Sequence, residues 1–323
     1  MQYGQFPDPR FTIAHLSDVH LLSPGRKQYD AIVPEMGLVH VLDRLSRVRP
    51  VPDALVFTGD LADKAEPAAY ARLRELVEPA AAELGAQVIW VMGNHDERAT
   101  YARGLFDRDL GDLDVDDVPA QDEVYDLGGL RVVSLDSSVP RYHHGEISDE
   151  QLAWLSEVLA TPAEHGTVLA LHHPPIPVPM VPQAAVIELY EMDRLATVLE
   201  GTDVRIILGG HYHYSTWSTF AGIPVSVASA SCYTTDVAPR DRLISGVDGH
   251  QAFSMVHVYD DRVVNTVVPL AEAPEVSGFG LDMLPLIDAL SPEERLDQIS
   301  RKDSPFNLGM EGPMVEPQPE MDR

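Results

Sequence analysis

Six short, continuous runs of apolar residues, rich in β-branched side chains, recur along the chain and alternate with longer segments of helical periodicity. The runs span residues 11–16, 54–57, 87–92, 130–135, 167–171 and 204–208. A strand that is apolar along its whole length is buried on both faces, as in a parallel sheet covered by helices. The alternation therefore predicts an α/β fold built from βαβ units.

Further elements are expected between and after these runs. The segments IPVSVAS, near residue 223, and SMVHVYDDRVVNTVVPL, near residue 254, alternate more regularly and predict antiparallel strands, the second pair turning at Asp260 and Asp261. Helices are expected over residues 66–84 and 148–160. The second of these opens with Ser148 and has Gln151 three residues later, which predicts a capping box.

The composition changes after Leu270. Residues 271–323 hold twelve acidic residues, four basic residues and seven prolines. We therefore expect a catalytic domain over residues 1–270 and an acidic extension, partly disordered, over residues 271–323. Within the extension, a capped helix is expected over residues 291–300 and disorder over residues 312–323.

Charge and cysteine content exclude several classes of function. With 51 acidic and 23 basic residues the formal net charge is −28, which repels nucleic-acid polymers and anionic membranes. The single cysteine, Cys232, fits a reducing compartment, and the first ten residues lack the layout of a signal peptide, so we expect a cytoplasmic protein. Cys232 itself is expected to be a small packed residue. No apolar run approaches the roughly 18 residues that a membrane span requires.

Polar residues that can bind metals follow five of the six predicted strands. They are Asp18 and His20; Asp60; Asn94 and His95; His172 and His173; and His211 and His213. Side chains just past the carboxyl ends of parallel strands converge in one crevice, so residues distant in the chain can share a site. His173 neighbours His172 on an extended segment and is expected to point away. Taken alone, Asn94 could instead cap a helix.

The chemistry of this set indicates a metal site. Imidazole together with carboxylate and amide oxygen suits manganese, iron, zinc or cobalt, and the lack of cysteine ligands argues against a closed structural zinc site. Seven candidate ligands exceed the needs of one ion. Two ions that share a bridging carboxylate would use all seven, and paired metals are a common solution for phosphate-ester hydrolysis.

Together the motifs DxH, GDxxD, GNHD, a later histidine and GHxH resemble the calcineurin-like metallophosphoesterases over about residues 11–270. The runs VFTGDLADK, LALHHPPIP and GTDVRIILGGHYHYS look closest to the bacterial class III cyclic-nucleotide phosphodiesterases of the mycobacterial type. The resemblance implies a four-layer αββα sandwich, a homodimer, and a small cyclic nucleotide such as 3′,5′-cAMP, or also a 2′,3′-cyclic nucleotide, as substrate. It implies iron with manganese or zinc as the metal pair, and manganese or cobalt should support activity.

The resemblance also implies residue roles. Asp18, His20, Asp60 and His213 would bind one metal, and Asp60, Asn94, His172 and His211 the other. His95 would lie beside the substrate phosphate and help the leaving oxygen depart after attack by a metal-bridging hydroxide. His143 and His144 match a loop near the site, and we expect His143 to face the substrate. Asp63, three residues after Asp60, is expected to orient His95 or a metal ligand.

Two alternatives use the same residues differently. A broader phosphodiesterase or a phosphomonoesterase, acting on phospholipid headgroups or aryl phosphates, would need the same metals. A catalytically silent scaffold of this fold is a further alternative, although such proteins typically lose ligands that are all in place here.

Overall fold

The computed structural model of the protein describes residues 4–308. Within it the chain divides into two compact units. The larger unit is Pro9–Ala271, and the smaller one combines the N-terminal residues up to Asp8 with the segment that begins at Glu272.

Two mixed β-sheets form the centre of the larger unit. In spatial order, the first sheet contains β13 (Val263–Pro269), β12 (Ala252–Val258), β1 (Phe11–Leu16), β2 (Ala54–Thr58) and β3 (Gln87–Val91). The second contains β4 (Glu123–Asp126), β5 (Arg131–Leu135), β6 (Thr167–Leu171), β7 (Val204–Gly209), β9 (Ile223–Val227) and β8 (Thr216–Phe220). A small hairpin-like pair, β10 (Thr234–Thr235) and β11 (Gly246–Val247), lies outside both sheets. All six apolar runs are strands, with bounds within one residue of those predicted.

The strand directions place several carboxyl ends together. In the first sheet β1, β2 and β3 are parallel, and in the second β5, β6, β7 and β9 are parallel. The predicted antiparallel pair near residue 254 is β12 and β13. The prediction for β9 was wrong in part, because β9 is parallel to β7 and antiparallel only to β8. The sequence analysis missed the edge strands β4 and β8, which are short and largely solvent-facing and so lack a continuous apolar run.

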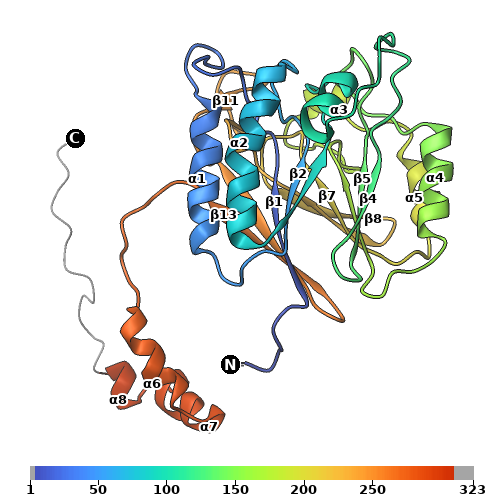
Figure 1. Ribbon diagram of the computed structural model, residues 1–323. Helices are drawn as coiled ribbons and strands as arrows, with labels where there is room; N and C mark the ends of the chain where they lie inside the picture. Colours follow the sequence, from blue (N-terminus) through green and yellow to red (C-terminus); the bar gives the residue numbers. More distant parts are fainter. Residues whose placement is uncertain (1–3, 309–323) are drawn as a thin grey trace. The chain divides into compact units, whose positions relative to one another are not determined.

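Side-chain alternation along the strands produces the layers. Ile13 of β1 and Val56 of β2 contribute to an apolar core shared by the two sheets. Leu16 and Phe57, on the opposite face, pack in a second core with the helices α1 (Pro34–Arg47) and α2 (Pro67–Leu84). Figure 1 shows these two helices against the outer face of the first sheet.

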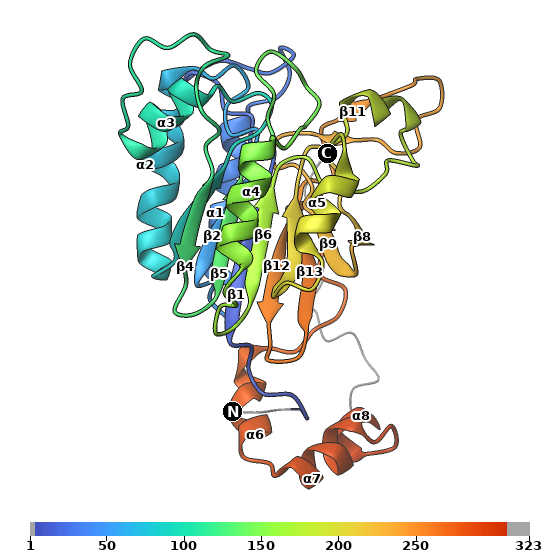
Figure 2. The same ribbon diagram turned by 90° about the vertical axis from the view of Figure 1, so that its right-hand side faces the viewer.

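The outer face of the second sheet is covered in the same way. Helices α4 (Asp149–Leu159) and α5 (Met192–Leu199) form a third core with residues of β5, β6, β7 and β9, and both helices lie over this sheet in Figure 2. The larger unit is therefore the predicted αββα sandwich. The capping box of Ser148 and Gln151 at the start of α4 is confirmed. Two other elements, α3 (Arg98–Phe106) and the 3₁₀ helix η1 (Pro182–Ile187), lie in connections near the strand ends.

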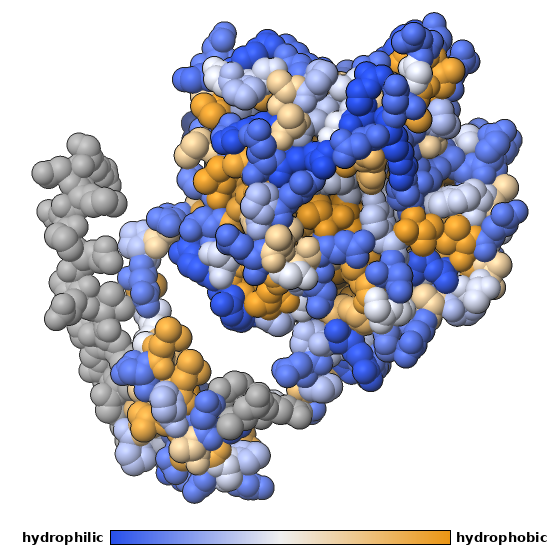
Figure 3. Space-filling model, viewed as in Figure 1, coloured by the Kyte–Doolittle hydropathy of each residue, from blue (hydrophilic) through white to orange (hydrophobic). Residues whose placement is uncertain are grey.

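The smaller unit contains only short helices among its described residues. They are η2 (Leu281–Met283), α6 (Leu284–Asp288), α7 (Pro292–Arg295), the π-helical turn η3 (Leu296–Ser300) and α8 (Pro305–Leu308). The helix expected over residues 291–300 is present as α7 continued by η3, with the Ser291–Glu294 capping box in place. Leu281, Leu284 and Leu286 are exposed, and apolar side chains gather on this unit in Figure 3. The disorder predicted for residues 312–323 falls outside the described residues.

No helix in the part of the chain that the structure describes is both long enough and apolar enough to cross a membrane.

Candidate metal centre

The loops that follow β1, β2 and β7 have an unusual backbone conformation. Within six residues of these strand ends, five non-glycine residues have positive φ angles: Asp18 (52°), His20 (50°), Asp60 (49°), His211 (73°) and His213 (58°). Residues with a Cβ atom adopt this conformation rarely, and it costs of the order of 1 kcal/mol or more per residue. All five are among the seven predicted ligands. The unfavourable backbone conformation at these positions therefore orients side chains of the predicted site.

Two glycines let the loops approach one another. Gly93 precedes Asn94, and a Cβ atom there would lie 2.1 Å from the backbone nitrogen of Asp60. Gly59 has a φ of +93°, and its Cβ atom would lie 2.4 Å from Nδ1 of His172. The loops after β2, β3 and β6 can therefore pack closely only with glycine at these positions.

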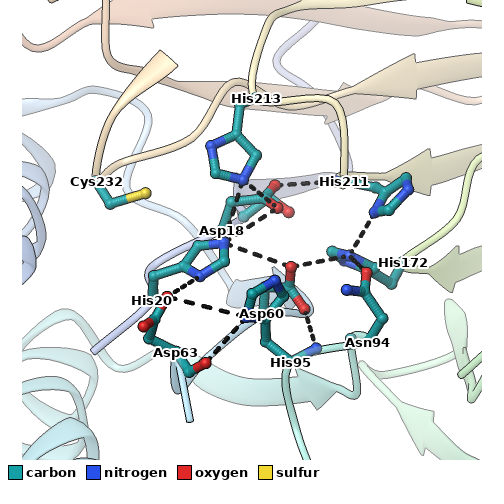
Figure 4. A network of polar contacts seen from close by, with 12 residues as sticks. Asp18, His20, Asp60, Asp63, Asn94, His95, His172, His211, His213 and Cys232 are labelled. Atoms are coloured by element: carbon teal, nitrogen blue, oxygen red, sulfur yellow. Dashed lines mark hydrogen bonds and ion pairs between the residues drawn. The ribbon is translucent and has the colours of Figure 1, made fainter. Parts of the chain in front are cut away.

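Asp60 lies at the centre of the cluster (Figure 4). Its Oδ2 atom is 3.4 Å from Nε2 of His20 and 3.4 Å from Nε2 of His172. Its Oδ1 atom accepts a hydrogen bond from the backbone nitrogen of His95 at 2.8 Å. One carboxylate oxygen thus faces two imidazoles from different sheets, as a bridging ligand would.

A first group of potential ligand atoms lies on one side of Asp60. Potential ligand atoms of Asp18, His20, Asp60 and His213 all lie within 4.8 Å of one another. Nε2 of His213 is 3.1 Å from Nε2 of His20 and 3.3 Å from Oδ1 of Asp18. That oxygen of Asp18 is buried and accepts no well-aligned hydrogen bond from any described residue, whereas Oδ2 accepts one from the backbone nitrogen of His211.

A second group lies on the other side. Nε2 of His172 is 3.1 Å from Oδ1 of Asn94 and 3.2 Å from Nδ1 of His211. Asp60 completes this group through the oxygen that it also turns to His20. The structure thus brings the seven predicted ligands together, with Asp60 between the two groups.

The outer nitrogen of each histidine is held by an acceptor. His20 Nδ1 faces Oδ1 of Asp63 at 3.1 Å, His172 Nδ1 the carbonyl of Thr58 at 2.7 Å, His211 Nε2 the carbonyl of Ile187 at 2.8 Å, and His213 Nδ1 the carbonyl of Tyr233 at 2.9 Å. A neutral imidazole has one N–H group, and donating it outward leaves a lone pair on the inner nitrogen. The inner nitrogens of His20 and His213 therefore face each other with their lone pairs, and so do those of His172 and His211. A cation between the two nitrogens of each pair would bind both lone pairs.

The charges of the cluster lead to the same conclusion. Burial opposes a charge on Asp18, but His213 and His172 hold the pKa of its carboxyl at about 2. Burial likewise disfavours a charge on His172, yet Asp60 raises the pKa of its imidazole to about 9. Burial and the neighbouring His172 lower the pKa of His211 to about 3. Two buried carboxylates thus attract positive charge, which metal cations would provide without protonating any ligand.

Asp63 and His95 lie beside the first group. The carboxylate of Asp63 accepts hydrogen bonds from His20 and, at 2.8 Å, from Nε2 of Gln28, while its backbone carbonyl accepts one from Nδ1 of His95 at 2.9 Å. Asp63 therefore contacts both a predicted ligand and His95. The side chain of His95 is 31% exposed and lines the cavity over the cluster.

The loop with the two adjacent histidines places only one of them in the cavity. His143 lines it, and the side-chain amide of Asn94 donates to Nδ1 of His143 at 2.8 Å. His144 stacks on Tyr190 and lies 3.1 Å from Glu146 instead. Asn94 does not cap α3, because its amide is used by His143 and His172 and α3 begins at Arg98.

Three residues near the cluster were not predicted to support it. His173 is fully buried, its ring lies 4.4 Å from that of His211, and its Nε2 atom donates to the carbonyl of His143 at 3.1 Å. Asp96, the last residue of GNHD, accepts hydrogen bonds from the backbone nitrogens of Leu61, Ala62 and Gly93 and thereby joins the loops after β2 and β3. The position of Asp96 in a glycine-containing turn after a strand was the sequence signal from which this role could have been predicted. Cys232 lies beside His213 (Figure 4), and burial raises the pKa of its thiol, as expected for a packed residue.

A cavity of about 640 Å³ lies over the cluster. The predicted metal ligands that line it are His20, Asp60, Asn94, His211 and His213, together with His95 and His143. The remaining lining is mainly apolar and aromatic, and a volume of this size is typical of small-molecule sites.

Comparisons with known proteins agree with this geometry. The model of the calcineurin-like phosphoesterase family matches residues 11–215. A probable cyclic nucleotide phosphodiesterase of Rhodococcus erythropolis is 53% identical over 267 residues, which cover 83% of this chain and 86% of that protein. A cAMP/cGMP dual specificity phosphodiesterase of Mycobacterium tuberculosis is 50% identical over 279 residues, 86% of each protein. Among solved structures, a dimetal phosphatase from Danio rerio shares the fold with a TM-score of 0.58 at 19% identity, over 82% of this chain and 98% of that one.

Proposed function

The chain belongs to the calcineurin-like phosphoesterase family, and on that premise we propose that it hydrolyses cyclic nucleotides, with 3′,5′-cAMP as a substrate. One observation supports the proposal most strongly. A single oxygen of Asp60 lies 3.4 Å from an imidazole nitrogen of each ligand group, His20 on one side and His172 on the other. That arrangement suits two metal ions that share one carboxylate ligand. Such dinuclear centres commonly catalyse the hydrolysis of phosphate esters.

The two groups define the proposed metal ligands. Asp18, His20, Asp60 and His213 would hold one ion, and Asp60, Asn94, His172 and His211 the other. Iron with manganese or zinc is the proposed pair, because imidazole, carboxylate and amide donors suit these metals. When bound, the ions would supply Lewis acidity for the phosphoryl oxygens and a water of lowered pKa at neutral pH.

His95 is the proposed proton donor to the leaving oxygen. Its Nδ1 atom donates to the carbonyl of Asp63, so Nε2 is the nitrogen left for the cavity. Burial disfavours the imidazolium, but Asp60 and the Asp63 carbonyl raise the pKa of His95 and favour the protonated form. The ribose 3′-oxygen is a poor leaving group, and a positioned acid typically accelerates such a step by about 10²–10⁴-fold. His143, whose ring centroid lies 5.3 Å from that of His95 and whose Nδ1 accepts from the Asn94 amide, is proposed to contact the substrate beside His95.

The substrate class can be tested directly. Full-length protein loaded with Mn²⁺ should hydrolyse 3′,5′-cAMP with a higher kcat/KM than bis(p-nitrophenyl) phosphate or p-nitrophenyl phosphate, and 2′,3′-cAMP should be tested alongside. Equal or faster turnover of the aryl esters would indicate a broader phosphodiesterase or a phosphomonoesterase. Protein that contains no metal and shows no activity after Mn²⁺ addition would indicate a silent scaffold.

We also propose a cytoplasmic homodimer that does not act on nucleic-acid polymers, with a catalytic domain of residues 1–270 and an extension of residues 271–323. The net charge of −28 supports the exclusion of polyanions, and the one cysteine, which is free, supports a reducing compartment. The division of the structure after Ala271 supports the domain boundary. Light scattering coupled to size exclusion should give twice the chain mass, and a monomeric mass would refute the dimer.

A further inference from the structure

The cavity over the metal cluster has two different walls. One carries Val178, Val181, Ala184 and Ile187 from the segment around η1, and the other carries Tyr29, Tyr233, Ile244 and Asp248 with their neighbours. Among the described residues that line the cavity, none is a lysine or an arginine. The part of the substrate that extends beyond the phosphate therefore meets no cationic side chain. An apolar or aromatic group without negative charge suits this lining.

Tyr29 lines the cavity with an exposed side chain and an unfavourable backbone conformation. The residue is 73% exposed, and its φ angle of 51° is in the left-handed region. It lies at the tip of a tight turn in which Gln28 and Ile32 exchange backbone hydrogen bonds. The turn accounts for the positive φ angle, which Asp30 shares, but not for the choice of a large aromatic side chain that is open to solvent beside the cavity. Contact with a ligand would account for that side chain.

Tyr233 forms the second side of a corner with Tyr29. The two ring centroids are 5.5 Å apart, their planes are at 79°, and the hydroxyl oxygens are 3.4 Å apart. A flat ring that stacks on one tyrosine presents its edge to the other, and both arrangements are favourable between aromatic groups. All four nucleobases have such a face, so stacking does not depend on the identity of the base.

Both tyrosines are tied to residues of the metal cluster. The backbone carbonyl of Tyr233 accepts the hydrogen bond from His213 Nδ1, and its ring lies 4.5 Å from that of His213. Gln28, directly before Tyr29, donates its side-chain amide to Asp63, which also accepts from His20. These anchors hold the aromatic corner at a set distance from the place where the phosphate would bind.

We propose that Tyr29 and Tyr233 bind the nucleobase of the substrate and determine selectivity for nucleoside cyclic phosphates over base-free phosphodiesters. The proposal rests on the function proposed above and adds to it the part of the site that recognises the base. Two other tyrosines, Tyr212 and Tyr214, line the cavity beside the residues around η1. Tyr212 is buried, its hydroxyl donates to the carbonyl of Ile176, and its ring already stacks on Tyr214, so the tyrosine corner is the better site for a planar base. Asp248 on the same wall disfavours a second phosphate there, which agrees with an uncharged base.

The experiment compares two substrates on matched variants of the Mn²⁺-loaded, full-length protein. The substrates are 3′,5′-cAMP and the 3′,5′-cyclic phosphate of methyl riboside, which lacks the base. Tyr29→Ala should lower kcat/KM for cAMP about 5- to 20-fold, at the lower end of measured stacking contributions, and leave the base-free substrate unchanged. Tyr29→Phe should retain activity on cAMP within about twofold, because it keeps the aromatic face.

Two further measurements make the result specific. Trp217→Ala removes another aromatic residue, 72% exposed on β8 and away from the cavity lining, and should change neither substrate. Adenosine, which has a base and no phosphate, should inhibit competitively, and Tyr29→Ala should raise its inhibition constant by the same factor as it lowers kcat/KM for cAMP. Equal losses on both substrates, or no loss on cAMP, would overturn the assignment of the base site. Failure of the wild-type protein to hydrolyse cAMP would instead overturn the proposed function, and this inference with it.

Discussion

Oδ1 of Asn94 lies 3.1 Å from Nε2 of His172, a nitrogen whose ring partner already faces the carbonyl of Thr58 at 2.7 Å. In neutral His172 both facing atoms are acceptors, so their proximity is favourable only with a positive charge nearby. The amide nitrogen of Asn94 cannot resolve this conflict, because it donates to His143. The pair is therefore arranged to bind a cation from two sides.

Replacing Asn94 tests this relationship. Asn94→Ala should lower the bound metal from about two ions to about one per chain and reduce kcat by more than about 100-fold, because an activating ion is lost. Mass spectrometry of the metals in protein purified without chelators measures the first effect. Asn94→Asp keeps an oxygen at the same place and should retain both ions. Two ions and normal turnover in Asn94→Ala would show that Asn94 is not a ligand.

Asp63 should act by holding His20 and not by touching the substrate. Asp63→Ala removes the acceptor for His20 Nδ1 but leaves the backbone carbonyl that binds His95. The expected result is a loss of metal affinity of about 10- to 100-fold, as for other groups that orient metal ligands. Excess Mn²⁺ should restore most of kcat, which equilibrium dialysis and assays at several metal concentrations would measure. A kcat that stays low at saturating Mn²⁺ would point to a direct role.

The two adjacent histidines of the 143–144 loop provide a matched pair. His143→Ala should reduce kcat/KM for cAMP by roughly tenfold or more, since His143 lines the cavity and binds Asn94. His144→Ala should stay within about twofold of wild type, because His144 packs on Tyr190 outside the cavity lining. Steady-state kinetics on both variants measures these changes in kcat/KM. A larger loss in His144→Ala than in His143→Ala would show that His144, not His143, contacts the substrate.

His173 is expected to matter for stability more than for chemistry. It is fully buried between Ser137, the carbonyl of His143 and the ring of His211. His173→Ala leaves a cavity and two unpaired polar groups, so the free energy of unfolding should fall by about 2–4 kcal/mol. Urea denaturation of metal-loaded protein measures this change, while the metal content should stay at two ions. An unchanged free energy of unfolding would show that His173 does not stabilise the fold.

Metal binding should strengthen as the pH rises. Burial opposes a charge on His172, but Asp60 raises the pKa of its imidazole to about 9, so below that pH the metal-free protein holds a proton on this ring. A metal must displace the proton, and the association constant should therefore increase about tenfold per pH unit for each proton released. Calorimetric titration of chelator-treated protein with Mn²⁺ between about pH 6 and 8 checks the sign. An affinity that falls as the pH rises would contradict the ligand role of His172.

The sequence was sufficient to locate the strands of the sandwich core and the residues at their ends. A strand buried on both faces is apolar at most positions, so β1, β6 and β7 could be recognised without knowledge of their neighbours. The order of the strand-end motifs also predicted which residues would meet, because parallel strands in a sheet end at the same edge. The capping boxes at Ser148 and Ser291 were equally local signals.

Only the tertiary structure decided how those residues are distributed and supported. The contact of His20 with His213 joins residues 193 positions apart, and the partition of ligands around Asp60 depends on how two sheets pack. The parallel pairing of β9 and the corner formed by Tyr29 and Tyr233 are likewise long-range. Local patterns report whether a residue is buried and which way it alternates, whereas the position of a side chain within an ångström follows from backbone strain and packing that involve the whole fold.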